Sequence, residues 1–111
     1  MEFSITEYKH CDLMEISGRI DSYTAPQINQ ALQALITDEH TNLVINMEDV
    51  TYISSSGILV FVNIQSRFHR QNRGKLVFSG TSDLVFSGFE LAGFDKIFEF
   101  YDDVVSAVGG F

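Results

Sequence analysis

The sequence lacks any apolar run that approaches the roughly 20 residues needed to cross a bilayer. Its first residues also lack the basic and then apolar layout of a secretory signal. Cys11 is the only cysteine, so the chain cannot form an internal disulfide, which fits a reducing compartment. These absences together predict a cytoplasmic protein that does not insert into membranes.

Positive charge is also scarce. Seven Lys and Arg residues stand against fifteen Asp and Glu residues, and the formal net charge is −8. Such a chain repels a nucleic-acid backbone, and it has no basic stripe with interleaved aromatic residues. Acidic charge does steer a basic protein toward the chain. Nucleic acid is therefore excluded as a partner, and a protein partner is allowed.

The apolar periodicity predicts five strands and four helices in the order β-β-α-β-α-β-α-β-α. The predicted strands cover residues 3–10, 13–16, 43–47, 75–79 and 96–101, and the predicted helices cover residues 26–37, 56–71, 82–93 and 104–108. Strands separated by helices run parallel through right-handed crossovers, and the initial hairpin adds one antiparallel edge strand. We therefore expect a single α/β domain over residues 1–111 with a mixed, mostly parallel sheet.

Three serines and a glycine, residues 54–57, follow the third predicted strand and precede a helix. We call this segment the serine turn. The carboxyl ends of parallel strands are where open α/β sheets bind ligands. Backbone N–H groups are free at the start of a helix, and a hydroxyl there faces solvent. The serine turn is therefore the first candidate for a functional site.

Catalysis is the weakest hypothesis for the serine turn. The nucleophile pattern G-x-S-x-G is absent, and His10, His40 and His69 fall in three separate segments, where we interpret them as solvated surface residues. Nucleotide-binding glycine patterns are absent too, although a weak anion site stays open. No Cys/His cluster or carboxylate cage indicates a metal, so we predict no enzyme activity, cofactor or metal.

A third hypothesis is that one serine accepts a phosphate. A turn before a helix exposes a hydroxyl, and the phosphate dianion would sit at the positive end of the helix. The following helix also has the pattern of an interface. Its residues Phe61, Ile64 and Phe68 share the face expected to pack on the sheet, whereas Leu59 lies on the polar side and Val62 at the edge. A leucine one turn from the serines suits a docking surface, although single exposed leucines are common.

Three segments resemble the STAS domains, specifically the bacterial anti-sigma factor antagonists. They are Ile-Asn-Met-Glu-Asp-Val-Thr-Tyr-Ile-Ser-Ser-Ser-Gly-Ile at residues 45–58, Gly-Arg-Ile-Asp at residues 18–21, and Leu-Ala-Gly-Phe-Asp-Lys-Ile-Phe at residues 91–98. The resemblance covers nearly the whole chain in the right order. It implies the STAS fold, and a regulator that binds an ATP-dependent serine kinase, itself an anti-sigma factor, when unphosphorylated. Phosphorylation by that kinase would release the regulator, and a metal-dependent serine phosphatase would restore it.

The resemblance also implies roles for individual residues. It places the phosphoacceptor at Ser55, with Ser54 and Ser56 as alternates, and partner contacts at Asp21, Ser56 and Gly57. Leu59 and Val62 complete the expected partner-binding surface. The family often has an aspartate where this chain has Ser54, which removes a charge and adds a competing hydroxyl. Two other functions stay open: a constitutive STAS scaffold or subunit of a signalling or lipid-transport complex, and a small-ligand sensor.

Overall fold

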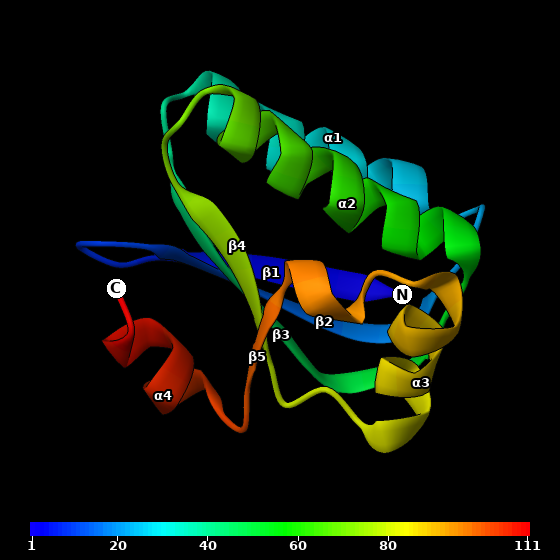
Figure 1. Ribbon diagram of the computed structural model, residues 1–111. Helices are drawn as coiled ribbons and strands as arrows, with labels where there is room; N and C mark the ends of the chain where they lie inside the picture. The colour runs from blue at the N-terminus through cyan, green and yellow to red at the C-terminus, as the bar shows by residue number, and fades with distance from the viewer.

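The computed structural model describes residues 1–111 as a five-stranded sheet with four α-helices, which confirms the predicted α/β class (Figure 1). The elements in chain order are β1 (Glu2–Glu7), β2 (Asp12–Ile20), α1 (Ala25–Thr37), β3 (Asn42–Ile53), α2 (Ser55–Arg70), β4 (Lys75–Ser79), α3 (Asp83–Ala92), a 3-10 turn (Asp95–Ile97), β5 (Glu99–Tyr101) and α4 (Val104–Gly109). None of these helices combines the length and the apolar character needed to cross a bilayer.

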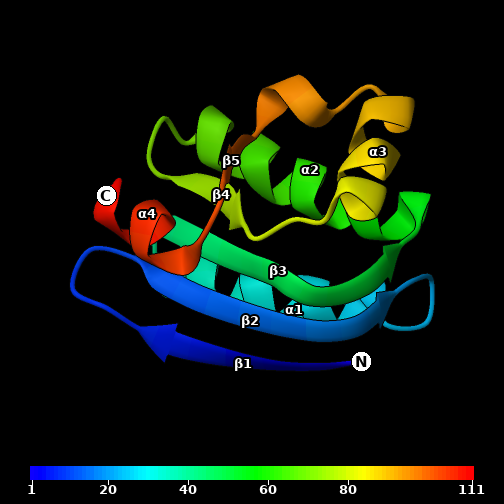
Figure 2. The ribbon, with the colours of Figure 1, turned by 90° about the horizontal axis from the view of Figure 1, so that it is seen from below.

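The strands lie in the sheet in the same order as in the chain, β1-β2-β3-β4-β5. β1 pairs antiparallel with β2, and the other three pairs are parallel. Because successive crossovers step the same way across the sheet with the same right hand, their helices must lie on one face. α1, α2 and α3 do so, whereas α4 packs on the opposite face (Figure 2).

The main core lies between the sheet and the three crossover helices. The expected α2 face is confirmed, since Phe61, Ile64 and Phe68 are all buried in it. At its centre the Phe78 ring of β4 lies 5.1 Å from the Phe61 ring and 5.1 Å from the Phe89 ring, in edge-to-face geometry that favours aromatic pairs. This packing fixes α2, and with it the serine turn, against the sheet.

β3 differs from its prediction because it continues to Ile53 instead of ending at residue 47. Its pairing with β2 contains two irregularities, and at each one β3 has an extra residue. At the first, the Asn46 side chain accepts a hydrogen bond from the Glu48 N–H at 3.1 Å. The extra residues break the alternation of buried and exposed side chains, so the pattern resembles a loop. β3 therefore ends immediately before the serine turn.

Three smaller corrections concern strand ends. The strand predicted over residues 3–10 ends earlier, because β1 covers Glu2–Glu7. The strand predicted over residues 13–16 is longer, because β2 continues through Gly18 and Arg19 to Ile20 and stays paired with the extended β3. The strand predicted over residues 96–101 is wrong in its first part, where a 3-10 turn covers Asp95–Ile97, and β5 covers Glu99–Tyr101 only.

Candidate functional site

The serine turn lies at the junction of β3 and α2. Ser54 is the N-cap residue, and its side-chain oxygen accepts a hydrogen bond from the Gly57 N–H at 3.2 Å. Ser55 and Ser56 occupy the first helical positions, and both are exposed. The three serines therefore differ in their surroundings: the Ser54 oxygen is used by the helix cap, whereas Ser55 and Ser56 face solvent.

Gly57 packs the serine turn against the ends of β2 and β3. It is buried, and a Cβ atom at this position would lie 2.6 Å from Ile20 Cγ2 and 2.9 Å from Ile53 Cγ1. The first turn of α2 therefore sits closer to the ends of β2 and β3 than any side chain would allow. The Ser54 N–H adds a hydrogen bond to the Ile20 carbonyl at 2.8 Å. These contacts hold the serine turn beside the loop that follows β2.

Asp21 organises that neighbouring loop. Its Oδ1 accepts hydrogen bonds from the N–H groups of Tyr23 at 3.0 Å and Thr24 at 3.2 Å. The hydrogen bond from the Tyr23 N–H, together with those from Thr24 and the nearby Arg19 charge, holds the pKa of the Asp21 carboxyl below its usual range. Asp21 therefore stays ionised at neutral pH, and it directly follows Ile20, whose carbonyl accepts the hydrogen bond from the Ser54 N–H.

Leu59 and Ser56 line a groove between the start of α1 and the first two turns of α2. The groove has a volume of about 330 Å³, and its other side is made by Ser22 of the Asp21 loop and by Pro26 of α1. The Leu59 side chain is 47% exposed, whereas Val62 is half-buried at the edge of the helix face. The exposed serines, the leucine and the Asp21 loop thus form one continuous surface, and we call it the switch surface.

The start of α2 favours an added anion at the serines, whereas the ionised Asp21 carboxylate of the same surface opposes it. No acidic residue lies in the first turn of α2, and Arg67, His69 and Arg70 lie in its last turn. The N–H groups at the start of the helix have no partners within it, so they and the helix dipole attract negative charge. A phosphate on Ser55 or Ser56 would therefore leave the helix intact while changing the charge of the surface.

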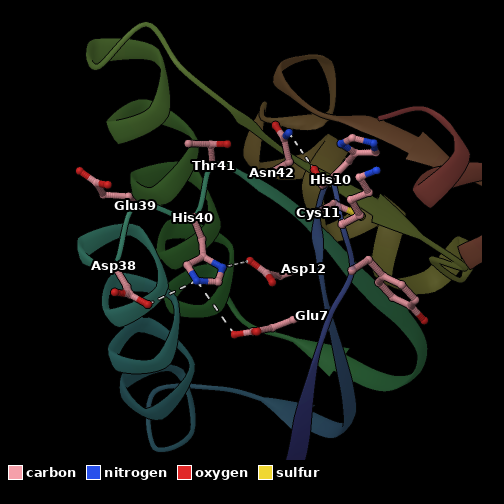
Figure 3. Close-up of a pocket in the computed structure, with 11 residues that line it drawn as sticks. Glu7, His10, Cys11, Asp12, Asp38, Glu39, His40, Thr41 and Asn42 are labelled. Atoms are coloured by element: carbon pink, nitrogen blue, oxygen red, sulfur yellow. Dashed lines mark hydrogen bonds and ion pairs between the residues drawn. The ribbon is translucent and has the colours of Figure 1, made fainter.

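A second polar cluster was missed by the sequence analysis. The interpretation of His40 as a solvated residue is wrong: it is partly buried, and its Nδ1 is hydrogen-bonded to the buried carboxylate of Asp12 (Figure 3). Glu7 and Asp38 face its other ring nitrogen. The hydrogen bond with Asp12 raises the pKa of His40 above its ordinary value. We call these four residues the His40 cluster.

Only the predicted pairing of the second and third strands could have indicated this cluster. Asp12 begins β2, and it stands opposite Leu43 in the parallel pairing with β3. The residues just before β3 must therefore lie near the start of β2. His40 and Asp12 are 28 positions apart, so no spacing motif connects them.

The fold and the serine turn together indicate the protein family. The family model of the STAS domain matches residues 2–107, and the chain belongs to the STAS domain family. Within it, the chain is 35% identical over 99 residues to the anti-sigma-B factor antagonist of Listeria monocytogenes, covering 89% of this chain and 85% of the relative.

Solved structures share the fold. The anti-sigma factor antagonist SpoIIAA in its unphosphorylated form superposes with a TM-score of 0.80 at 18% identity, over 99% of this chain and 98% of that one. The Bacillus cell fate determinant SpoIIAA in its phosphorylated form gives a TM-score of 0.78 at 15% identity, over 98% of each chain. The resemblance to STAS domains and the predicted STAS fold are thereby confirmed.

Proposed function

We propose that the protein is an anti-sigma factor antagonist that works by switching partners and has no catalytic activity of its own. The supporting observation is its similarity to an anti-sigma-B factor antagonist along most of both chains. The exposed serines of the switch surface are the proposed sites at which phosphorylation controls partner binding. The proposed partner is an anti-sigma factor with serine kinase activity, in the cytoplasm, and a metal-dependent serine phosphatase reverses the modification.

Ser55 is the proposed phosphoacceptor. Its hydroxyl is exposed at the first position of α2, whereas the Ser54 side chain caps the helix. SpoIIAA, which shares the fold, has been solved in unphosphorylated and phosphorylated forms. Phosphorylation adds between about −1.5 and −2 charges at neutral pH. Next to the fixed charge of Asp21, that dianion would face the partner and must be desolvated on binding, which weakens the complex.

The test of the acceptor is a phosphorylation assay with a candidate anti-sigma factor kinase and ATP. We expect one phosphate, mapped by mass spectrometry to Ser55, and no phosphate on Ser55→Ala. The matched control is Ser56→Ala, which exposes the same backbone and should be modified like the wild type. Continued modification of Ser55→Ala, with phosphate on Ser54 or Ser56, would contradict the assignment.

Partner binding is tested separately. Ser55→Asp should weaken the affinity for the kinase roughly 10- to 100-fold, because it brings an unpaired charge into the interface. Leu59→Ala should weaken it roughly tenfold if Leu59 is a central contact. Leu91→Ala is the matched control, because Leu91 is 90% exposed but lies on α3 outside the switch surface. Equal affinities of the Leu59 and Leu91 variants would rule out the proposed docking side.

A further inference from the structure

The His40 cluster lies at the opposite end of β3 from the serine turn. Its members come from three places: Glu7 ends β1, Asp12 begins β2, and Asp38 and His40 lie in the connection from α1 to β3. Figure 3 shows the imidazole ring of His40 at the centre, with carboxylates around it. These residues line a pocket of about 320 Å³ between the β1–β2 turn and that connection. Nothing in the proposed partner switch uses them.

The two nitrogens of the His40 ring have different surroundings. Nδ1 faces the Asp12 carboxylate, whose side chain is only 5% exposed. Nε2 points outward, 3.4 Å from Asp38 Oδ2 and 4.0 Å from Glu7 Oε1. In the neutral ring, a carboxylate bonded to Nδ1 holds the proton on that nitrogen and leaves the lone pair on Nε2, which is the arrangement of histidines that ligate metals.

One pair of the outward-facing atoms, on His40 and Asp38, has the spacing of metal ligands. Zinc binds histidine nitrogen and carboxylate oxygen at about 2.0–2.2 Å in tetrahedral geometry, which places two ligand atoms about 3.3–3.5 Å apart. The distance between His40 Nε2 and Asp38 Oδ2 already has this value. Glu7 Oε1 lies 4.0 Å from His40 Nε2, and the Glu7 side chain is 71% exposed. It can therefore move to the ligand distance without disturbing the core. One nitrogen and two carboxylate oxygens suit zinc better than calcium or magnesium, which take oxygen ligands.

We propose that the protein binds a zinc ion at this corner through His40 Nε2, Glu7 and Asp38. Asp12 is a positioning residue that holds the imidazole from the buried side. The fourth position is open to water. A proton on Nε2 leaves to solvent when the metal binds, so binding competes with protonation. The ion joins the β1–β2 turn to the connection before β3, and it stabilises the fold in proportion to its occupancy.

The direct test is titration of the purified full chain with Zn²⁺ at pH 8 by isothermal calorimetry. We expect saturable binding of one ion. His40→Gln should abolish it. Asp38→Asn should weaken it about tenfold or more, and because Asp38 is 85% exposed this variant should fold normally. Asp12→Asn should weaken it roughly 10- to 100-fold.

His69→Gln and His10→Gln are matched controls, because both histidines are exposed and neither belongs to the cluster. Both should bind Zn²⁺ like the wild type. Co²⁺ supplies an independent readout, since the intense visible bands of a tetrahedral complex should appear in the wild type and be lost in Asp38→Asn. Absence of saturable Zn²⁺ binding would overturn the proposal. So would binding that Asp38→Asn leaves unchanged, or that His10→Gln abolishes.

Discussion

At the scale of single residues, Gly57 shows how tightly the serine turn is held. Its conformation is ordinary for a helix, so a glycine is needed here for space and not for backbone freedom. The two isoleucines that it touches come from the ends of β2 and β3, so one hydrogen atom in place of a side chain lets three elements meet.

Gly57→Ala should therefore destabilise the protein by about 1–3 kcal/mol, because the added Cβ forces Ile20 and Ile53 apart. Gly88→Ala is the matched control. A Cβ at Gly88 would lie 3.6 Å from Ile53 Cγ2, an ordinary contact, and alanine favours a helix, so this change should be neutral or stabilise by up to about 1 kcal/mol. Urea denaturation measures both, and equal effects of the two substitutions would refute the packing explanation.

Asp21 predicts a pH dependence. Its folded pKa is lowered, chiefly by the hydrogen bond from the Tyr23 N–H. A lowered carboxyl pKa contributes stability above the unfolded value of about 3.9, and that stability is lost as the pH falls through the folded value. The carboxyl resonance of Asp21 followed by NMR should titrate below about 3.9. The stability difference between wild type and Asp21→Asn should shrink in the same acid range. A midpoint at or above the unfolded value would contradict the role of these hydrogen bonds.

At the scale of elements, β3 explains what the sequence could and could not predict. The order and type of the elements were predictable because α2 keeps the helical spacing and the first half of β3 is a short continuous apolar run. The second half of β3 has neither pattern, since its buried residues Met47, Val50 and Ile53 are three positions apart, with one exposed pair between each two of them. A bulged strand has no characteristic period, so its sequence resembles a loop.

The same limit applies to the sites. The serine turn was predictable because its residues are contiguous and sit at an element boundary. The His40 cluster was not, because Asp12 and His40 become neighbours only through the register of β2 on β3. The packing role of Gly57 also depends on its distances to Ile20 and Ile53, and a sequence motif contains no such distances. Local chemistry was therefore predictable, and contacts between elements required the structure.

The start of α2 gives a prediction that separates capping from signalling. Ser54→Ala removes the acceptor for the Gly57 N–H and should cost about 1 kcal/mol of stability. Ser55→Ala and Ser56→Ala should each change stability by less than about 0.5 kcal/mol, because both residues are exposed. Thermal and urea unfolding of the three variants provide the comparison. A loss of stability in Ser55→Ala equal to that in Ser54→Ala would mean that Ser55 also supports the fold.

At the scale of the whole molecule, β3 separates two sites. The His40 cluster lies before Asn42 and the serine turn follows Ile53, with twelve residues of strand between them. At about 3.3 Å per residue, the two ends are much further apart than the roughly 10 Å over which substitutions usually influence one another. The two sites should therefore act independently on stability.

Ser54→Ala combined with Asp38→Asn tests that independence. Their effects on the free energy of unfolding should add to within about 0.5 kcal/mol. Gly57→Ala combined with Ile20→Ala is the contrasting pair. Ile20→Ala removes Ile20 Cγ2, the atom that would lie 2.6 Å from the Cβ added by Gly57→Ala. That pair should couple by about 0.5–3 kcal/mol. Coupling of the distant pair as large as that of the contacting pair would show that the ends of β3 communicate.

The strand order has a kinetic consequence. Each strand pairs with the one before it in the chain, so no strand has to be inserted between two strands that have already paired. During synthesis the hairpin of β1 and β2 emerges first, and each later strand then adds at the same growing edge. Every step closes a loop of one helix and its turns, which keeps the entropy cost of each addition small. The nascent chain can therefore assemble from its N-terminus, with α4 docking last on the opposite face.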